Sequence, residues 1–308
     1  MAKRSDEAAT AHAPLIAPDM MSTTEVADYL RVSERTIYDL LKEKKIPSSR
    51  VTGKWLFPKK LIDRWVAQNT EYSPAKTRDA APIVAGSHDP LLEWALRESH
   101  SGLAMMTGGS LDGIRRVADG DVVAAGTHLI DSLTGEFNVP YLRAHYARSH
   151  LVVIQWAKRR QGLIVRPPDV ARVASVAKLK TSKLRVVLRQ PEAGGFHLLN
   201  HLLERESIDV SQLITTDTPA LTDGDLAQKI RDGEGDVGLA CESAAHAAGL
   251  AFVPLIEERF DLVLRRRDYF EPPLQALFTF ARGAAFAKRA EAMRGYDLSG
   301  HGQVMLNE

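Results

Sequence analysis

The sequence predicts an α/β protein of two domains, a small helix-turn-helix unit with a β-hairpin wing and a larger domain of roughly 220 residues built on a sheet. Two observations predict this division. Helical patterns and a hairpin pattern fill residues 22–66, and from residue 83 onward apolar strand patterns alternate with helical patterns. A chain of 308 residues is also too long for the small unit alone.

The first two helices are predicted between residues 22 and 42. Residues 22–24 carry hydroxyls that can cap the first helix, residues 31–32 make a tight turn, and Ser33 is expected to cap the second helix. Apolar residues recur at helical spacing on the inner faces, which leaves polar and cationic residues outside. The inward residues are Val26, Ala27, Leu30, Ile37, Leu40 and Leu41.

A wing and a third helix complete the small unit. Pro47 ends the second helix, and residues 50–57 are predicted to form a hairpin that turns at Thr52 and Gly53, because glycine supplies the positive φ of such a turn. A third helix after Pro58 is expected to close the core. Its apolar face consists of Leu61, Ile62, Trp65 and Val66.

This arrangement lets a helix enter the major groove of DNA while its neighbour braces the backbone and a cationic wing touches phosphates. Residues 22–70 hold ten basic and six acidic residues, an excess of +4, whereas the whole chain carries +1 and the rest therefore −3. Basic charge thus gathers where phosphate binding needs it. The expected DNA contacts are Ser33, Arg35, Thr36, Tyr38, Lys42, Arg50 and Lys54. The alternatives are that Tyr38 packs against its own unit and that the cations are only a solvated face.

The small unit resembles the winged helix-turn-helix of the excisionase and MerR-like family. Residues 24–27 (TEVA), 32–38 (VSERTIY) and 54–57 (KWLF) carry the resemblance, and their order and spacing agree with it. The resemblance implies binding of double-stranded DNA. A homodimer is expected, because one small reading unit rarely gives enough affinity and two would suit a palindromic site.

Four segments are expected along the chain. Residues 1–20 form a disordered tail, residues 21–70 the DNA-binding domain, residues 71–82 a polar linker and residues 83–308 the larger domain. The single cysteine, Cys241, excludes an intrachain disulfide and suits a reducing compartment. No apolar run approaches the roughly 20 residues that span a membrane, and the start lacks a secretory signal, so we expect the protein in the cytoplasm and away from membranes.

The larger domain is predicted to contain a parallel sheet, because small and hydroxyl residues follow one strand pattern after another and a crevice forms along the carboxyl ends of such strands. Strands are predicted at residues 83–85, 103–106, 121–126, 152–154, 184–188, 236–240, 252–255 and 260–264, with 163–165 pairing back. Helices are predicted at residues 91–96, 111–117, 140–150, 196–203, 226–230, 243–248 and through most of 272–293.

Residues 80 to 300 resemble the type II periplasmic-binding-protein fold, which has two lobes. The segments that carry this resemblance are GDVGLA (235–240), GLAFVPL (249–255) and ERFDLV (258–263). With SHDP (87–90), HL (128–129) and RQ (189–190), they resemble the cytoplasmic branch related to molybdate-binding proteins, which occurs fused to helix-turn-helix domains. The resemblance implies a two-lobed, periplasmic-binding-protein-like sensor domain whose effector is molybdate or tungstate.

A tetrahedral oxyanion is best bound by many neutral donors, which helix N-termini and hydroxyls provide. Three loops of the first lobe and one of the second meet this requirement, with Arg159 and Arg160 expected at the rim. Gly194 and Gly195 stand where relatives offer a hydroxyl, which favours backbone donors and leaves open a bulkier, molybdenum-cofactor-like pterin ligand. The expected ligand contacts are Ser87, His88, Thr107, Gly109, Ser110, Thr127, His128, Arg159, Arg160, Arg189, Gln190, Gly194 and Gly195.

The sequence therefore predicts a transcription regulator that responds to a small anion, requires no cofactor and is not an enzyme. Consecutive residues 87–89 (SHD) cannot point at one another as a catalytic triad does, and the glycine loop at residues 108–110 lacks the lysine of a phosphate loop. No pair of His or Cys residues has zinc-site spacing, and Cys241 is expected to be buried. His88 could instead cap a helix, and His128 could be structural. The alternative is a solute-binding protein or enzyme with a vestigial helix-turn-helix.

Overall fold

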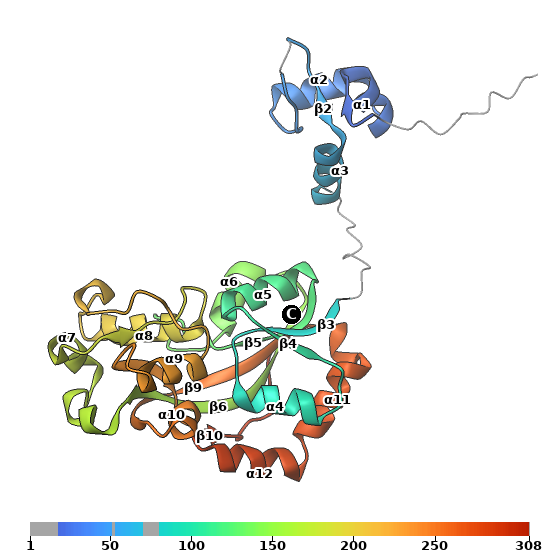
Figure 1. The fold of residues 1–308 in the computed structure, drawn as a ribbon. Helices are drawn as coiled ribbons and strands as arrows, with labels where there is room; N and C mark the ends of the chain where they lie inside the picture. The colour runs from blue at the N-terminus through green and yellow to red at the C-terminus, as the bar shows by residue number, and fades with distance from the viewer. Residues whose placement is uncertain (1–17, 51–52, 70–79, 308) are drawn as a thin grey trace, which may run out of the picture. The chain divides into compact units, whose positions relative to one another are not determined.

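The computed structural model describes residues 18–50, 53–69 and 80–307, and the chain divides into two compact units, residues 1–77 and 78–308. Both units are drawn in Figure 1, and the larger one contains a mixed sheet with helices on both of its faces. The predicted fold class, a helix-turn-helix followed by a two-lobed α/β domain, is confirmed.

The small unit packs three helices against a two-stranded antiparallel sheet. Its helices are α1 (Thr23–Leu30), α2 (Glu34–Lys42) and α3 (Lys59–Gln68), and its strands are β1 (Met20–Met21) and β2 (Phe57–Pro58). These elements bury one compact apolar cluster, which fixes the angle between α1 and α2. The cluster consists of Met21, Val26, Ala27, Ile37, Ile46, Phe57 and Ile62, with Leu30, Leu40, Leu41 and Trp55 packed at its edge.

The structure differs from the predictions at both ends of this unit. Met20, which we assigned to the tail, lies in β1 opposite Pro58. Leu61 and Val66, expected to face inward, are 46% and 39% exposed, because α3 turns Ile62 into the core instead. Residues 1–17 and most of the predicted linker lie outside the described residues.

The predicted wing is described in part. Ser49 and Leu56 exchange two backbone hydrogen bonds of 2.8 Å, so the two arms pair as a hairpin does. Gly53 has a φ of +78°, the left-handed conformation for which we expected a glycine at this position. The other predicted turn residue, Thr52, lies outside the described residues.

The larger unit is built on a nine-stranded sheet in the order β4-β3-β5-β9-β6-β8-β7, with β10 and β11 added to β6. The sheet is mixed. The predicted parallel pairing holds for β3 with β4 and β5 and for β7 with β8, but a wholly parallel sheet was wrong, because β9 runs antiparallel to β5 and β6 runs antiparallel to β8 and β9. Its strands are β3 (Ala81–Gly86), β4 (Ala104–Thr107), β5 (Val122–Thr127), β6 (Leu151–Val165), β7 (Val186–Val187), β8 (Val237–Cys241), β9 (Ala251–Arg265), β10 (Tyr296–Asp297) and β11 (Val304–Asn307).

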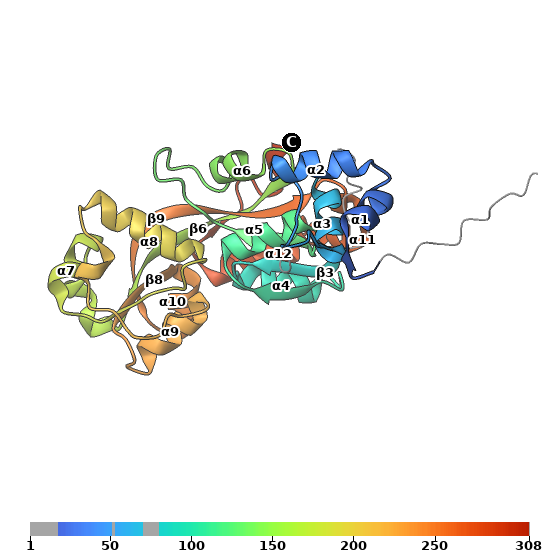
Figure 2. The ribbon, with the colours of Figure 1, turned by 90° about the horizontal axis from the view of Figure 1, so that it is seen from above.

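Two long strands, β6 and β9, run through both lobes (Figure 2). In the first lobe, Leu151 of β6 pairs with Arg265 at the end of β9, and in the second lobe Val165 pairs with Ala251 at its start. We predicted each of these strands as two pieces, and this was wrong. The polar run that we read as a break in β6 stays in the strand, because its side chains pair with charges of β9.

The first lobe surrounds β3, β4 and β5, and the second surrounds β7 and β8 (Figure 1). The first lobe carries α4 (Pro90–Glu98), α5 (Ser110–Asp119), α6 (Val139–Tyr146), α11 (Pro272–Ala281) and α12 (Ala284–Met293). The second carries α7 (Leu179–Ser182), α8 (Gly194–Arg205), α9 (Asp223–Arg231) and α10 (Glu242–Ala248). Each lobe buries one apolar cluster on each face of its part of the sheet.

Candidate functional site

Helix α2 has its N-terminus fixed by hydroxyls that we expected to bind DNA. Ser33 Oγ accepts a 3.2 Å hydrogen bond from the backbone N–H of Thr36 and lies 2.9 Å from Thr36 Oγ1. The hydroxyl of Thr24 in α1 donates to Glu34 of α2 at 2.6 Å. These contacts hold the turn between the two helices, so the first residues of α2 keep one orientation.

The outer face of α2 is open to a partner. Arg35, Tyr38 and Lys42 are exposed, and Tyr38 keeps 52% of its surface in solvent, so it does not pack inward. Within residues 18–50 and 53–69, neither Arg35 nor Lys42 forms an ion pair. This face therefore combines two uncompensated cations with a phenol, donors that suit phosphates and base edges.

The wing also presents cations. Arg50 and Lys54 are exposed, with the Arg50 guanidinium 5.2 Å from the centroid of the Trp55 ring and its Nε 3.4 Å from the carbonyl of Gly53. A second contact that we did not predict braces the unit, since Tyr29 donates to Asp63 at 2.7 Å. The wing arginine is thus held in place by an aromatic face.

In the larger unit, the start of α5 brings three predicted ligand residues together. Ser87 Oγ and Ser110 Oγ lie 2.9 Å apart, and the backbone N–H of His128 donates to Ser110 Oγ at 3.2 Å. All three residues are buried. The side chain of Thr127 is fully buried as well, and its Oγ1 has no hydrogen-bond partner among the described residues, which leaves one hydroxyl for a ligand.

The second lobe meets this cluster at the start of α8. The carbonyl of Glu192 accepts from the backbone N–H of Leu111 at 3.3 Å, and a Cβ on Gly109 would lie 2.6 Å from that carbonyl oxygen. A Cβ on Gly194 would lie 2.8 to 2.9 Å from three ring atoms of His128. Glycine at both positions therefore lets the N-termini of α5 and α8 approach the same place, and the first N–H groups of a helix have no partners within it.

His128 is also tied to the long strands. Its Nδ1 lies 2.8 Å from Glu258 Oε2. Burial alone raises the pKa of Glu258, but attraction to Arg159 and His128 outweighs burial and lowers this pKa to about 2. Because the carboxylate is ionised, Nδ1 of His128 donates the hydrogen bond, and the ring orientation is fixed beside α8.

We expected Arg159 at the rim of the site, but the structure buries it in the middle of β6, where it is 1% exposed. Its guanidinium pairs with Glu258 and, at 3.0 Å, with Asp89, which also accepts from the Tyr296 hydroxyl at 2.7 Å. Its neighbour Arg160 is exposed and lies 2.6 Å from Glu242. Successive side chains of β6 point to opposite faces of the sheet, so Arg159 is buried and Arg160 faces solvent.

Arg189 is engaged within the second lobe. It is 6% exposed, pairs with Asp223 and donates to the carbonyl of Leu221 at 2.9 Å. Burial raises the pKa of Asp223, but Arg189 and Arg159 outweigh it and lower this pKa to about 2. Gln190 donates weakly to Leu221 at 3.4 Å and keeps a buried Oε1 without a partner among the described residues.

Two predicted contacts lie away from this cluster. His88 is half-buried and its Nε2 lies 3.0 Å from Glu93 of α4, so it sits against the start of that helix. Thr107 is exposed at the end of the edge strand β4. The converging set is therefore narrower than the predicted one. Contacts bring together Ser87, Gly109, Ser110, His128 and Gly194, and Thr127 directly precedes His128 in the chain.

We did not predict the acidic residues that organise the site. Asp261 of β9 is fully buried, accepts from Asn138 at 2.7 Å and lies 3.0 Å from Arg259. Burial raises the pKa of Asp261 to about 6, against the opposing pull of Arg259 and Asn138. An acid within the apolar run of residues 260–264 was the signal in the sequence, because charges there must be paired.

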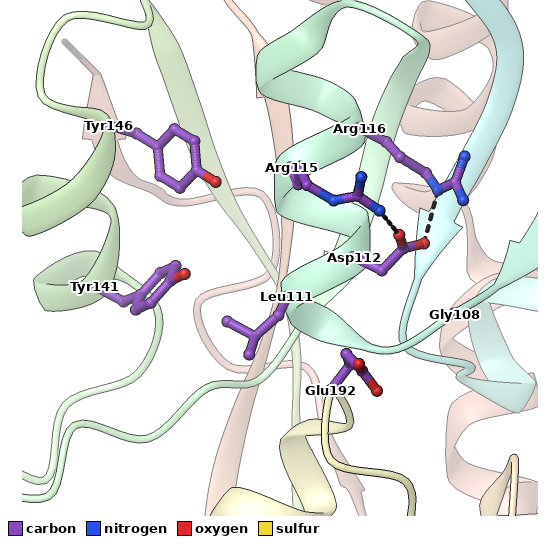
Figure 3. Close-up of a pocket in the computed structure, with 8 residues that line it drawn as sticks. All are labelled: Gly108, Leu111, Asp112, Arg115, Arg116, Tyr141, Tyr146 and Glu192. Atoms are coloured by element: carbon purple, nitrogen blue, oxygen red, sulfur yellow. Dashed lines mark hydrogen bonds and ion pairs between the residues drawn. The ribbon is translucent and has the colours of Figure 1, made fainter.

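A groove opens beside this cluster, between α5, α6 and the loop before α8 (Figure 3). We call it the tyrosine groove, and its volume is about 590 Å³. Tyr141 and Tyr146 form one wall, Arg115 and Asp112 of α5 form the other, and Glu192 of the second lobe lies at its edge. A second pocket of about 250 Å³ shares Tyr141 with it.

Two family models match this chain. Residues 93–282 match the PBP superfamily domain, and residues 20–70 match a helix-turn-helix domain. The first match spans more than half of the chain. Among the described residues, no helix combines the length and apolar character needed to cross a bilayer.

This chain is similar to two uncharacterized proteins and to one solved binding protein. The uncharacterized protein YvgK of Bacillus subtilis (strain 168) is 24% identical over 301 residues, which cover 92% of this chain and 96% of that protein. An uncharacterized protein from the 5′ region of a 2Fe-2S ferredoxin gene of Clostridium pasteurianum is 27% identical over 81 residues, 26% of this chain and 72% of that protein. A phosphate ABC transporter substrate-binding protein from Clostridium perfringens, solved with bound phosphate, shares the fold at a TM-score of 0.50 and 12% identity, covering 68% of this chain and 96% of that one.

Proposed function

Since the chain belongs to the PBP superfamily and carries a helix-turn-helix domain, we propose that it is a ligand-responsive transcription regulator that acts in the cytoplasm. The helix-turn-helix unit binds an operator as part of a homodimer, and the larger unit binds a small anion between its lobes. A ligand that prefers one arrangement of the lobes shifts the population toward it, which changes how paired DNA-binding units are presented.

One observation carries the proposed ligand class. The N-termini of α5 and α8 meet beside the hydroxyls of Ser87, Ser110 and Thr127, while the nearby arginines, Arg159 and Arg189, are already paired with carboxylates. Neutral donors with helix dipoles therefore remain for the ligand, as a tetrahedral oxyanion requires. We propose molybdate or tungstate, or a molybdenum-cofactor-like ligand, as the effector.

Thermal unfolding of the full chain with an anion panel tests this proposal. Molybdate or tungstate at a hundredfold excess over its Kd is expected to stabilise the protein by about 2.7 kcal/mol, because only the folded state binds. The Ser110→Ala variant is expected to bind about tenfold more weakly, as it loses one buried hydrogen-bonding group. Ser211→Ala, at an exposed position of the second lobe, serves as the matched control. If no anion stabilises the protein, the proposed ligand class is wrong.

A second experiment, operator binding with and without the anion, separates a regulator from a solute-binding protein with a vestigial helix-turn-helix. A regulator must bind duplex DNA from its own promoter region, and its affinity must change when the anion is added. Stabilisation by the anion without any DNA binding would favour the solute-binding protein.

A further inference from the structure

The tyrosine groove lies next to the proposed anion site. Leu111 lines the groove, and its backbone N–H donates across the lobe boundary to the carbonyl of Glu192. Glu192 lines the groove as well. A four-oxygen anion would occupy only a small part of about 590 Å³, a volume typical of pockets for larger organic ligands. The space available beside the anion site is therefore greater than a bare oxyanion needs.

The groove has an aromatic wall that is already in position. The ring of Tyr141 stacks on His145 with centroids 4.3 Å apart and an angle of 25° between the planes. Tyr146 lies 6.3 Å from Tyr141 and packs against the apolar cluster beneath α5 and α6. Both rings are labelled in Figure 3, on the side of the groove that faces Arg115. Such rings favour a flat, aromatic ligand, since stacking requires a second planar surface.

The charged residues of the groove suit two parts of a ligand, an anionic substituent and ring N–H groups. Arg115 and Arg116 both pair with the carboxylate of Asp112, and Asp119 at the end of α5 brings the charge of this helix to zero. The Arg115 side chain is 62% exposed, so it can reach an anionic substituent. Glu192 is exposed across the groove and can accept hydrogen bonds from ring N–H groups.

The second pocket extends the same surface. It shares Leu111 and Tyr141 with the groove and is lined by His197 of α8. His197 Nε2 is buried and has no hydrogen-bond partner among the described residues. A buried polar atom without a partner costs free energy unless a ligand or water satisfies it, so this atom marks a further point of contact.

We propose that the tyrosine groove binds a planar heteroaromatic anion, a fused ring with N–H groups and a carboxylate or phosphate substituent, and that this ligand rather than a bare oxyanion is the effector. The inference rests on the proposed function, because it names the ligand class of the same regulator. The ring stacks on the tyrosines, the anionic group meets Arg115 and the N-terminus of α5, and Glu192 accepts from the ring.

Calorimetric titration of the full chain with 6-carboxypterin, guanosine 5′-monophosphate and molybdate tests the inference. At least one of the two aromatic anions is expected to bind, and 6-methylpterin, which lacks the carboxylate, is expected to bind at least tenfold more weakly than 6-carboxypterin if the latter is the ligand. Tyr141→Ala and Arg115→Gln are each expected to weaken the aromatic anion about tenfold.

Two controls match these variants. Phe270→Ala removes a ring that is 72% exposed elsewhere in the unit, and Arg97→Gln removes an exposed arginine paired with Glu93 on α4. Both should leave affinity unchanged. Binding of neither aromatic anion, or binding that is insensitive to Tyr141→Ala and Arg115→Gln, overturns the inference. If molybdate alone binds and alters DNA affinity, the inference fails while the proposed regulator stands. If promoter DNA affinity responds to none of the three compounds, the proposed function fails as well.

Discussion

Single side chains of the larger unit divide into those that hold the lobes together and those left for a ligand. Arg159 shows the first kind, because Asp89 and Glu258 enclose its guanidinium and Phe260 lies 4.3 Å from it. Thr127 shows the second, since its buried hydroxyl lacks a partner among the described residues. Arg159, which we expected to contact the anion, therefore has a structural role.

Replacing Arg159 by methionine is expected to lower the free energy of unfolding by about 3–5 kcal/mol, because two buried carboxylates lose their shared cation. Urea denaturation at neutral pH measures this cost. The control is Arg160→Met at the next position of β6, where the exposed ion pair with Glu242 is worth at most about 1 kcal/mol. Equal costs for the two variants would contradict the buried network.

Asp261 is expected to make stability depend on pH. Its pKa rises from 3.8 in the unfolded chain to about 6 in the folded one, so the folded state holds the proton more tightly. This group's contribution is fully present below pH 4 and is lost as the pH rises to about 6. The stability of Asp261→Asn relative to the native protein should therefore increase between pH 4 and pH 7, by about 3 kcal/mol at most.

Urea denaturation at several pH values measures this difference. Asp236→Asn is the matched control, because the lowered pKa of that carboxylate makes its contribution to stability fully present above pH 4. This variant should therefore be less stable than the native protein by a nearly constant amount from pH 4 to pH 7. A difference for Asp261→Asn that stays constant from pH 4 to pH 7 would show that the buried acid does not titrate in this range.

Among the elements, α2 has the clearest part in DNA binding, because its first turn is fixed by Ser33 while its cations remain exposed. Arg35→Ala is expected to weaken operator binding by about 1–3 kcal/mol, the value of one good base contact. Fluorescence anisotropy at fixed salt measures the change. Arg97→Ala, an exposed arginine of the larger unit, should have no effect, and an unchanged affinity for Arg35→Ala would remove this residue from the interface.

The elements also show what the sequence could predict. Local periodicity predicts α1 and α2 of the small unit and also α5, β8 and α10, since their apolar faces are regular. The long strands β6 and β9 could not be predicted, because residues 158–161 are polar and the acids that pair with them, on β9, on α10 and before α4, lie far away along the chain. Strands β10 and β11 depend on pairing with β6, more than 130 residues away along the chain, and they have no signal of their own.

The candidate site could also be predicted only in part from the sequence. The sequence predicted that Ser87 and Ser110 lie close together, because parallel strands bring their carboxyl ends to one edge of the sheet. The roles of Arg159 and Arg189 were not, because the acids that engage them, such as Asp89 and Asp223, lie 70 and 34 residues away in sequence. The partner of a buried charge can therefore be identified only in the folded structure.

At the scale of the molecule, β6 and β9 are the connections through which one lobe can move against the other. Their register shifts near Gln155 and Gln161, which interrupts regular pairing at the middle of both strands. His128 joins this middle region to α8 through Glu258 and Gly194. The ligand that we propose at the start of α8 would therefore lie beside a contact between the two lobes.

His128→Ala is expected to alter the coupling between ligand and DNA more than it alters folding. Loss of the ring removes the contact with Gly194 and leaves Glu258 paired with Arg159, so stability should fall by about 1–3 kcal/mol. The change in operator affinity on adding ligand should shrink several-fold. Ser211→Ala, at an exposed position of the second lobe, should leave that change intact.

Operator affinity of the full chain, measured at fixed salt with and without saturating effector, tests the central claim most directly. We expect the protein to bind duplex DNA from its own promoter region, and the Kd to change at least fivefold when the anion is added, the smallest coupling typical of allosteric proteins. Reaching the same change in operator Kd with Ser110→Ala should require about ten times more anion. An operator Kd that is the same with and without every anion that binds the larger unit would contradict a ligand-responsive regulator.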